Sequence, residues 1–414
     1  MGTATGEAER SGEKPLGGSA DGAADPGYSM SNGLVARLRA LDIALAVTSY
    51  QSGLLYMLGR NPETGGLNVH QTPVLRPMGL APAPDGSFVL AAGFHLIRFV
   101  NALQPDQRAN AIFDACYMPR IVHLTGELDA HDVGLDAAGR AIFVNTRFNC
   151  LATLSERYSF EELWRPPFVS ALVDEDRCHL NGLAMQDGAP AYVTAVSRSD
   201  TIDGWRDRRA DGGVVIAVNT GEVVCEKLSM PHSPRLHNGR LWLLNAGTGE
   251  FGTVVLPTAG GMGRFEPLAF CPGFLRGLAF AGRYAFVGLS RPRYKRFEGL
   301  ALDERLKAAD SEPWCGVQVI DLERGSCVDW FRIDGAVAEL YDLAVLPGAV
   351  CPMAVSPGSS DAASVVSHAP GARQTSKAGP AGPRHPAKLL PRLQRQPRVR
   401  RDPSGTTGRS DCHE

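Results

Sequence analysis

Hydrophobic and polar positions between residues 33 and 349 follow a short pattern that recurs along the chain. Two apolar runs flank a turn, as in PMGLAPAPDGSFVLAAG from Pro77 and AHDVGLDAAGRAIFVNT from Ala130. Further copies are LNGLAMQDGAPAYVTAV from Leu180, PHSPRLHNGRLWLLNAG from Pro231, LRGLAFAGRYAFVGLS from Leu275 and YDLAVLPG from Tyr341. Turn residues such as PDG and HNG between two apolar runs predict β-hairpins.

The copies are regularly spaced. Their second residues are 53, 50, 51, 44 and 66 positions apart along the chain. Further apolar runs follow most hairpins, such as GGVVIAVN and EVVCEKLS. Four short antiparallel strands in a unit of about 50 residues are typical of a propeller blade. The pattern predicts an all-β fold, a six-bladed β-propeller.

The two ends of the repeat region predict how the ring closes. The first apolar runs, IALAVTSY, GLLYMLGR and LNVHQTPVL, resemble a blade without its inner strand. The last copy, LYDLAVLPG, resembles an inner strand without the other three. We therefore expect the C-terminal strand to join the N-terminal blade, because closure removes free sheet edges.

Composition divides the chain into three parts. The net charge of −2 conceals a segment from residue 352 to 414 with ten Lys/Arg, four Asp/Glu and nine Pro. Residues 1–32 are rich in Gly, Ala and acidic residues. Such segments bury too little apolar surface to fold. We expect a disordered head (1–32), one propeller domain (33–349) and a disordered basic, Pro-rich tail (350–414), which contacts nucleic acid weakly at most.

Charge, hydropathy and cysteine usage exclude several classes. The near-neutral charge excludes a globally basic nucleic-acid binder. No apolar run is long enough to span a bilayer, and the first residues lack the pattern of a secretory signal. The nine cysteines show no CxxC pairs, which suits a reducing compartment. We expect a cytoplasmic protein whose oligomeric state the sequence leaves open.

Polar residues stand at the start of most predicted inner strands. In a propeller these positions surround the central axis, so they are expected to converge on one face. They are Met78, His131, Asn181, His232, Arg276 and Asp342, with His179 and Tyr341 as neighbours. Burying polar groups costs free energy unless they are paired. The set predicts either an axial ligand pocket or a hydrogen-bonded polar plug in a wet channel.

The axial set suggests specific chemistry. In the catalytic interpretation, His131 and His232 bind a metal or transfer protons, Asp342 orients one of them, and Arg276 stabilises developing negative charge. His131, His232 and His179 together are candidate ligands for a divalent transition metal such as zinc, iron or copper. No local HxH or HExxH motif supports a metal, so the histidines equally suit carboxylate binding or acid–base work.

Loops on the same face add candidate ligand contacts. These are Tyr50, Arg147, Arg198, Trp205 and Arg291. Two loops are long, at 197–213 and 290–316, and the second contains the helical pattern GLALDERLKAAD. An Arg-rich, aromatic rim attracts anions, although interleaved Asp residues can neutralise it. Loops of this length in a compact repeat usually have a role.

A GxGxxG sequence at 247–252 does not indicate a dinucleotide site. It follows the strand LWLLN but precedes another strand, GTVVL. A dinucleotide site needs a helix N-terminus there. We therefore interpret it as a turn between strands.

Several segments resemble a known family. TSYQSGLLYMLG, HDVGLD, SRSDTIDGWRDRRADGGVVI and MPHSPRLHNGRLWLLNAGTGE are similar to the bacterial conserved hypothetical proteins called TIGR03032, which are related to the DUF4915 group. The resemblance covers about residues 40–348. It implies a propeller-like domain and no established reaction. At the level of fold alone, six-bladed lactonases and peptidyl-hydroxyglycine lyases are similar in placing metal ligands on the axis.

The sequence therefore leaves two functions open. In the first, the axial pocket binds a small or peptide-like anionic ligand and is the site of a metal-assisted lyase, hydrolase or oxidative enzyme. In the second, the protein is a non-catalytic platform whose broad face binds a protein or peptide. The sequence identifies neither the substrate nor the reaction.

Overall fold

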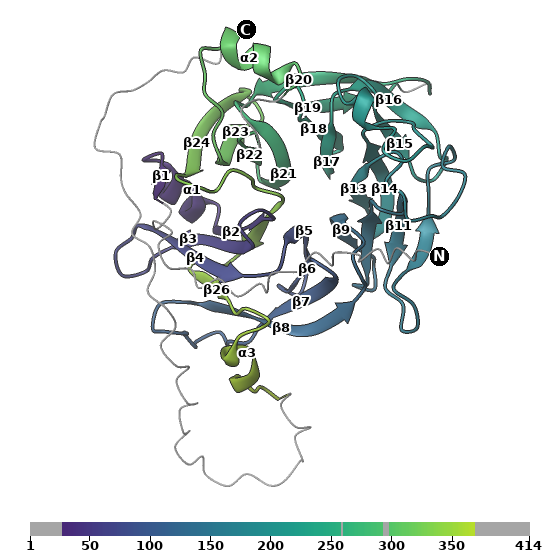
Figure 1. The fold of residues 1–414 in the computed structure, drawn as a ribbon. Helices are drawn as coiled ribbons and strands as arrows, with labels where there is room; N and C mark the ends of the chain where they lie inside the picture. The colour runs from purple at the N-terminus through teal and green to yellow at the C-terminus, as the bar shows by residue number, and fades with distance from the viewer. Residues whose placement is uncertain (1–26, 258–259, 293–297, 369–414) are drawn as a thin grey trace, which may run out of the picture.

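Six antiparallel sheets surround a central axis. The computed structural model of the chain describes residues 27–257, 260–292 and 298–368. Its six sheets are arranged one after another around the ring, and each sheet is one blade (Figure 1). This confirms the predicted six-bladed β-propeller. We number the blades in chain order and describe each from the axis outward.

The first three blades come from the N-terminal half of the chain. Blade 1 contains β25 (Leu343–Pro347), β2 (Ile43–Ser49), β3 (Leu54–Arg60) and β4 (Leu67–Pro73). Blade 2 contains β5 (Pro77–Pro82), β6 (Phe88–Ala92), β7 (His95–Asn101), β8 (Ala115–Leu124) and β26 (Pro352–Ala354). Blade 3 contains β9 (Ala130–Leu135), β10 (Ala141–Asn145), β11 (Cys150–Thr153) and β12 (Glu161–Trp164).

The other three blades complete the ring. Blade 4 contains β13 (Leu180–Gln186), β14 (Ala189–Ala195), β15 (Gly213–Ala217) and β16 (Val223–Leu228). Blade 5 contains β17 (Pro231–His237), β18 (Arg240–Asn245), β19 (Glu250–Val255) and β20 (Arg264–Phe270). Blade 6 contains β21 (Phe274–Ala281), β22 (Tyr284–Ser290), β23 (Gly316–Asp321), β24 (Ser326–Ile333) and β1 (Tyr28–Met30).

The C-terminal inner strand closes the ring as predicted. β25 pairs antiparallel with β2, with Val47 opposite Leu343 and Ile43 opposite Pro347. Every residue of β2 is buried, because neighbouring strands flank its two edges and neighbouring blades cover its two faces. Ring closure thus joins segments about 300 positions apart and leaves β2 without a free edge.

The described fold is longer than the predicted range of 33–349. β1 extends the outer edge of β24, and β26 runs parallel to β8 at the outer edge of blade 2. Each is three residues long, too short for an alternating pattern to be recognised in the sequence. The remainder of the predicted head and tail, residues 1–26 and 369–414, lies outside the described residues.

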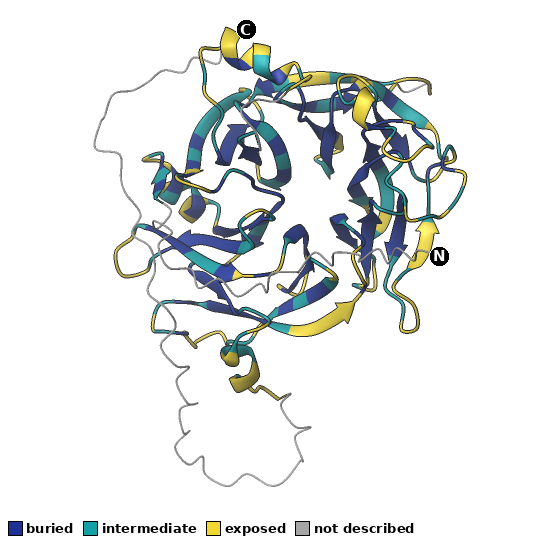
Figure 2. Cartoon of the chain, viewed as in Figure 1, coloured by how far each residue is buried: buried dark blue, intermediate teal, exposed yellow. Residues whose placement is uncertain are grey.

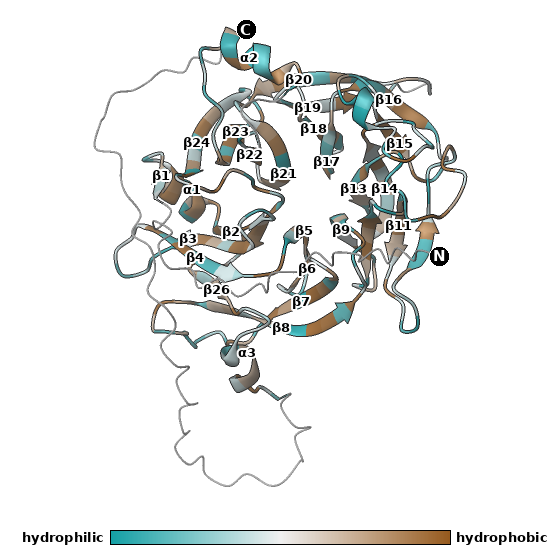
Figure 3. Cartoon of the chain, viewed as in Figure 1, coloured by the Kyte–Doolittle hydropathy of each residue, from teal (hydrophilic) through white to brown (hydrophobic). Residues whose placement is uncertain are grey.

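The core lies between the blades. Buried residues fill the strands that face neighbouring blades, and the exposed residues gather in loops and on outer strands (Figure 2). Apolar segments follow the same strands, while hydrophilic residues concentrate in the connections (Figure 3). Phe88 and Phe99 are fully buried and stack with ring centroids 5.0 Å apart in the core of blade 2. The predicted hairpins therefore form because each apolar face is covered by the next blade.

Helices are short and lie outside the sheets. They are α1 (Leu34–Ala40), α2 (Leu302–Ala308) and α3 (Ser360–Ser364), with a 3-10 turn at Arg206–Arg208. α2 confirms the helical pattern predicted within 290–316. Among the described residues, no helix is long and apolar enough to cross a membrane.

The closing strand should carry a large share of the stability. Leu346 is 3% exposed and packs between blades 1 and 2, so Leu346→Ala should lower the free energy of unfolding by about 2–5 kcal/mol. Chemical denaturation monitored by tryptophan fluorescence measures this. Pro347→Ala, at the exposed end of the same strand, is the control and should stay within about 0.5 kcal/mol of the parent. Equal losses in both variants would contradict a buried closing strand.

Candidate functional site

A cavity of about 850 Å³ opens around the starts of the inner strands. Its wall includes residues before or within β9, β13, β21 and β25 together with residues of the loops that follow β2, β14 and β22. Propeller geometry predicted this combination, because inner-strand starts and these loops share one face. The cavity is large enough for a small-molecule ligand.

Seven of the predicted site residues line this cavity. They are Tyr50, His131, His179, Trp205, Arg276, Arg291 and Tyr341. They come from four different blades and two long loops, and only ring closure brings them together. Their proximity agrees with the predicted axial pocket, while their roles in binding or catalysis stay a prediction.

The hydrogen bonds of His131 fix its neutral tautomer. Its Nδ1 lies 2.9 Å from the carbonyl oxygen of Asp129 and 2.8 Å from the hydroxyl of Thr146. A carbonyl accepts only, and the Thr146 hydroxyl donates to the carbonyl of Leu180, so Nδ1 carries the proton. Nε2 is then a lone-pair acceptor. Burial lowers the pKa of His131 to about 4; Asp129 opposes this shift and nearby positive groups add to it.

His179 forms a pair with a carboxylate. Its Nδ1 donates to Asp176 Oδ2 at 2.6 Å, and its backbone N–H donates to Asp176 Oδ1 at 3.0 Å. The ring stacks on Trp205 at 4.2 Å between centroids and meets the His131 ring edge-on at 4.9 Å. Nε2 of His179 and Nε2 of His131 have no hydrogen-bond partner among the described residues. A carboxylate on Nδ1 stabilises the imidazolium that forms when Nε2 takes a proton.

Aromatic contacts extend the wall from His131 to Arg276. The Tyr341 ring lies 5.5 Å from His131, and the Arg276 guanidinium carbon lies 4.7 Å above the Tyr341 ring. Arg276 Nη1 donates to Glu339 Oε1 at 3.0 Å, and its buried Nε has no hydrogen-bond partner among the described residues. The guanidinium is therefore held in place with donor capacity to spare.

Two further arginines bring positive charge to the rim. Arg209 donates to the carbonyl of Arg206, and Arg291 donates to the carbonyl of Val337. Within the described part of the chain, neither guanidinium has a carboxylate partner. By contrast, Arg206 is paired with Asp203 at 2.8 Å. The interleaved Asp residues therefore neutralise the positive charge of Arg206 but not that of Arg209 or Arg291 within the described residues.

The cavity wall lacks four of the predicted axial residues: Met78, Asn181, His232 and Asp342. Met78 is 2% exposed and packs in the apolar cluster between blades 2 and 3. Asn181 accepts from Thr194 at 2.7 Å and faces His232 Nε2 at 3.4 Å. His232 donates through Nδ1 to the carbonyl of Met230, and burial holds its pKa well below the usual range. Met78 is thus packed in the core, and Asn181 and His232 are hydrogen-bonded to the protein, which is the alternative that the sequence left open.

Two predicted loop arginines also lie elsewhere. Arg147 forms an ion pair with Asp174 and donates to the carbonyl of Glu127 at 2.9 Å. Arg198 is exposed and is absent from the cavity wall. Long flexible side chains on loops can point in many directions, so their position on the correct face did not fix their orientation.

The carboxylate of Asp342 contacts backbone N–H groups and not a histidine. Its Oδ2 accepts from the N–H of Leu80, and its Oδ1 accepts from the N–H of Leu343. Asp132 makes the same pair of contacts with blades 3 and 4. Asp342 is therefore equivalent to Asp132, and Tyr341 is equivalent to His131. Since neighbouring side chains in a strand point in opposite directions, this one-residue difference in register removes Asp342 from the histidines.

Asp342 belongs to a buried charge cluster instead. Arg235 donates to both carboxylate oxygens of Asp132, at 2.7 and 3.1 Å, and lies 3.6 Å from Asp342. Burial raises the pKa of Asp342 to about 7, with Asp132 adding to the shift and Arg235 opposing it. For Arg235, burial alone would lower the pKa, but the two carboxylates outweigh it and raise the pKa. The cluster links blades 1, 3 and 5 across the axis.

The predicted three-histidine metal site has no support in the side-chain positions. In the described ranges, no group of three or more His, Cys, Asp or Glu side chains is arranged to hold a metal ion. His131 and His179 line the cavity, and His232 does not.

Sequence reasoning missed the acidic residues of the site. Asp129 precedes His131 by two positions, Asp176 precedes His179 by three, and Glu339 precedes Tyr341 by two. Each lies just before an inner strand, where the backbone turns toward the axis. Asp129 and His179 have positive φ angles of 54° and 51°. A search for acidic residues up to three positions before each axial histidine would have found two of them.

The neutral state of buried His131 should make stability depend on pH. Its pKa is about 4 in the folded protein and about 6.5 when unfolded, so the unfolded state binds the proton first as pH falls. Stability should then fall between pH 6.5 and 4, by up to about 3 kcal/mol from this group. Denaturation at a series of pH values should show a smaller fall in His131→Gln.

Two outcomes decide this prediction. His123→Gln, at an exposed position on β8, is the control and should retain the parent's pH dependence. A His131→Gln variant that loses stability over the same range as steeply as the parent would contradict a neutral, buried imidazole.

Comparisons with known proteins place the chain in a family but do not assign an activity. No curated protein matches. Similar solved structures include a chain of a nidogen/laminin complex, at 11% identity and a TM-score of 0.45 over 74% of this chain and 99% of that one. A virginiamycin B lyase from Staphylococcus aureus is 11% identical, with a TM-score of 0.38 over 75% of this chain and 95% of that one. A gluconolactonase from Xanthomonas campestris is 12% identical, with a TM-score of 0.41 over 72% of this chain and 87% of that one. Residues 32–355 match the family described as "Domain of unknown function (DUF4915)", and the chain belongs to that family.

Proposed function

We propose that the axial cavity binds a small molecule carrying a carboxylate and abstracts a proton from the carbon beside that carboxylate, as in a lyase. One observation carries the proposal. Two histidines stand 4.9 Å apart on one wall, each with Nδ1 held by the protein and Nε2 without a described partner. Nearby lies a fixed guanidinium, that of Arg276.

The His179–Asp176 pair is the proposed base. His179 Nε2 takes the proton, the C–H bond breaks, and its electron pair stays on the substrate. Asp176 stabilises the resulting imidazolium through its bond to Nδ1. His131 is uncharged near neutral pH, so its Nε2 accepts a hydrogen bond from the substrate and helps to orient it.

Arginines on the wall are the proposed anion contacts. Arg276 has an unused buried Nε–H, and Arg209 and Arg291 have no described carboxylate partner. A guanidinium binds carboxylates through two parallel N–H donors. Negative charge that develops on the substrate during proton abstraction is stabilised by the same groups.

Aromatic side chains give the cavity a second kind of contact. Trp205 stacks on His179, and Tyr50 and Tyr341 lie 6.0 Å apart, with Tyr341 next to His131. Such surfaces favour a ligand with an apolar or planar portion in addition to its carboxylate. A small or peptide-like anionic ligand meets both requirements.

Hydrogen–deuterium exchange at carbon tests the proposal directly. The protein is incubated in D₂O with a panel of small carboxylates, including 2-hydroxy acids and N-acyl amino acids, and loss of the α-proton is followed by NMR. Asp176→Asn should slow the exchange of a responsive compound by about 10²–10⁴-fold, because the imidazolium loses its partner. Binding of that compound should change far less. Arg276→Gln should instead weaken binding.

The control is Asp174→Asn, an exposed carboxylate two positions before Asp176 that pairs with Arg147; neither Asp174 nor Arg147 lines the cavity wall. It should leave both exchange and binding unchanged. Binding of a carboxylate without exchange, unaffected by Asp176→Asn, would indicate the alternative function, a non-catalytic binding platform. No binding by any member of the panel would count against an anion site altogether.

A further inference from the structure

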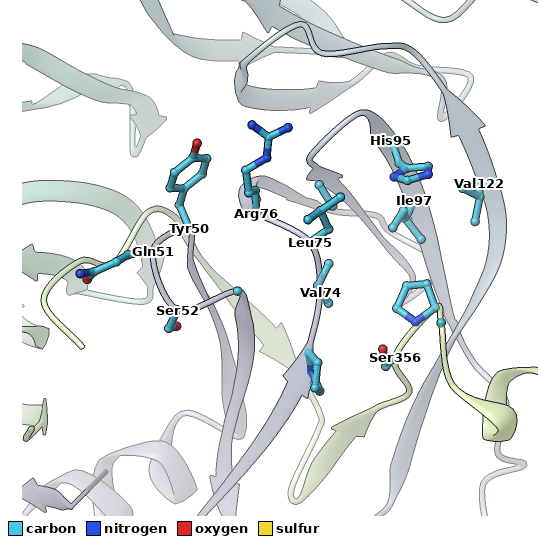
Figure 4. A pocket seen from close by; sticks show the side chains of 15 residues that line it. Tyr50, Gln51, Ser52, Val74, Leu75, Arg76, His95, Ile97, Val122 and Ser356 are labelled. Carbon is cyan, nitrogen blue, oxygen red and sulfur yellow. The ribbon is translucent and has the colours of Figure 1, made fainter. Parts of the chain in front are cut away.

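A second cavity, a groove of about 620 Å³, lies in the seam between blades 1 and 2. Its walls are the loop after β2, the segment that connects β4 to β5, and the neighbouring strands β7 and β8 of blade 2. Figure 4 shows the side chains of Val74, Leu75, Ile97 and Val122 around this space. The volume of the groove is in the range of small-molecule sites.

Two apolar side chains of the groove are unusually exposed. Leu75 is 52% exposed and Val122 is 48% exposed. Val122 lies opposite Ile97 in the β7–β8 pair, so both side chains are on the groove face of the sheet, whereas Ile121 points to the other face. Exposed apolar surface in a concave site gains free energy when an apolar group covers it. The groove therefore suits an apolar chain.

Tyr50 belongs to both cavities. Its side chain is part of the wall of the groove and part of the wall of the axial cavity. On the axial side, the Tyr50 ring lies 6.0 Å from the ring of Tyr341. On the groove side, Arg76 lies beside Tyr50 (Figure 4). A ligand that is longer than the axial cavity therefore has a route past Tyr50 into the groove.

Arg76 supplies a polar contact where the groove meets Tyr50. The N–H of Gly93 donates to the carbonyl of Arg76 at 3.1 Å, which holds its backbone in the seam between the blades. The Arg76 guanidinium forms an ion pair with Glu127, which neutralises its charge. A guanidinium has five N–H donors, so donors remain for a ligand after this pairing. Because its charge is neutralised, Arg76 suits an amide carbonyl better than a second carboxylate.

The rim formed by the two long loops is less suitable for an apolar chain. It brings Arg206, Arg209 and Arg291 to the wall of the axial cavity. An apolar chain laid against these side chains would remove water from charged groups, which costs free energy. The groove is therefore the favourable direction in which an apolar part of the ligand extends from the axial cavity.

We propose that the groove is a second subsite of the axial site and that the ligand is an N-acyl amino acid. Its carboxylate lies beside Arg276 in the axial cavity, and its amide carbonyl accepts a hydrogen bond from Arg76. Its acyl chain passes Tyr50 and lies in the groove between Leu75 and Val122. This inference rests on the anion site proposed above and adds the class of substrate.

Calorimetric titration of the full-length protein with N-acetyl-, N-butanoyl-, N-hexanoyl- and N-octanoylglycine tests the inference. Once the chain reaches the groove, affinity should rise about fourfold for each added methylene, the gain expected when one CH₂ group is buried. N-octanoylglycinamide, which has no carboxylate, should bind at least tenfold more weakly than N-octanoylglycine, because it lacks the contact with Arg276.

A pair of neighbouring variants locates the acyl chain. Val122→Asp places a charge in the groove and should weaken binding of N-octanoylglycine at least tenfold, with binding of N-acetylglycine unchanged. The matched control is Ile121→Asp, which adds the same charge at a similarly exposed position on the other face of β8. It should bind both compounds as the parent does. Unchanged melting temperatures show that both variants are folded.

Four results would overturn the inference. Binding of N-acetylglycine with no gain from a longer chain would remove the acyl subsite and leave the anion site standing. No binding by any of the four acylglycines would remove both. Equal losses in Val122→Asp and Ile121→Asp would place the acyl chain outside the groove. Equal affinities of N-octanoylglycine and its amide would make the groove an independent apolar site.

Discussion

Pairing between β25 and β2 is the contact on which the rest of the molecule depends. It joins the two ends of the folded chain and continues beyond the strands, where Thr48 accepts from the N–H of Tyr341 and Ser49 donates to the carbonyl of Glu339. These contacts hold Glu339 and Tyr341 beside Tyr50 on the cavity wall. The site therefore exists only in the closed ring, and closure and site formation are one event.

Alternation along the inner strands separates structural polar residues from residues of the cavity. Asp132, Ser233 and Asp342 each accept a backbone N–H from the next blade. They lie one position after His131, His232 and Tyr341 and so point the other way. Gly277 permits this close approach, since a Cβ there would lie 2.8 Å from the backbone nitrogen of Leu343. One set of side chains thus connects the blades, while His131 and Tyr341 of the other set face the ligand space.

The sequence predicted the fold well because each blade repeats a local pattern of turn residues and apolar runs. Register was harder to predict. Asp342 was aligned with His131, although its equivalent is Asp132, because the final copy lacks the hairpin that aligned the others. Arg147 was on the correct face, but an exposed ion pair with Asp174 turns it away. Asp176 was not predicted as a site residue because its contact with His179 depends on the positive φ of His179, which the residue types do not reveal.

The histidines near the axis differ in the partner of Nδ1, and the roles proposed for them rest on this difference. His131 and His232 donate to backbone carbonyls, which do not gain from a charged ring, and burial keeps both neutral. His179 donates to a carboxylate, which stabilises a charged ring. Positive charge on Arg276 disfavours protonation of the other two further. Among these three histidines, His179 alone donates its Nδ1 proton directly to a carboxylate, whereas the Asp129 carboxylate lies 3.7 Å from Nδ1 of His131 and supports a charged ring there more weakly.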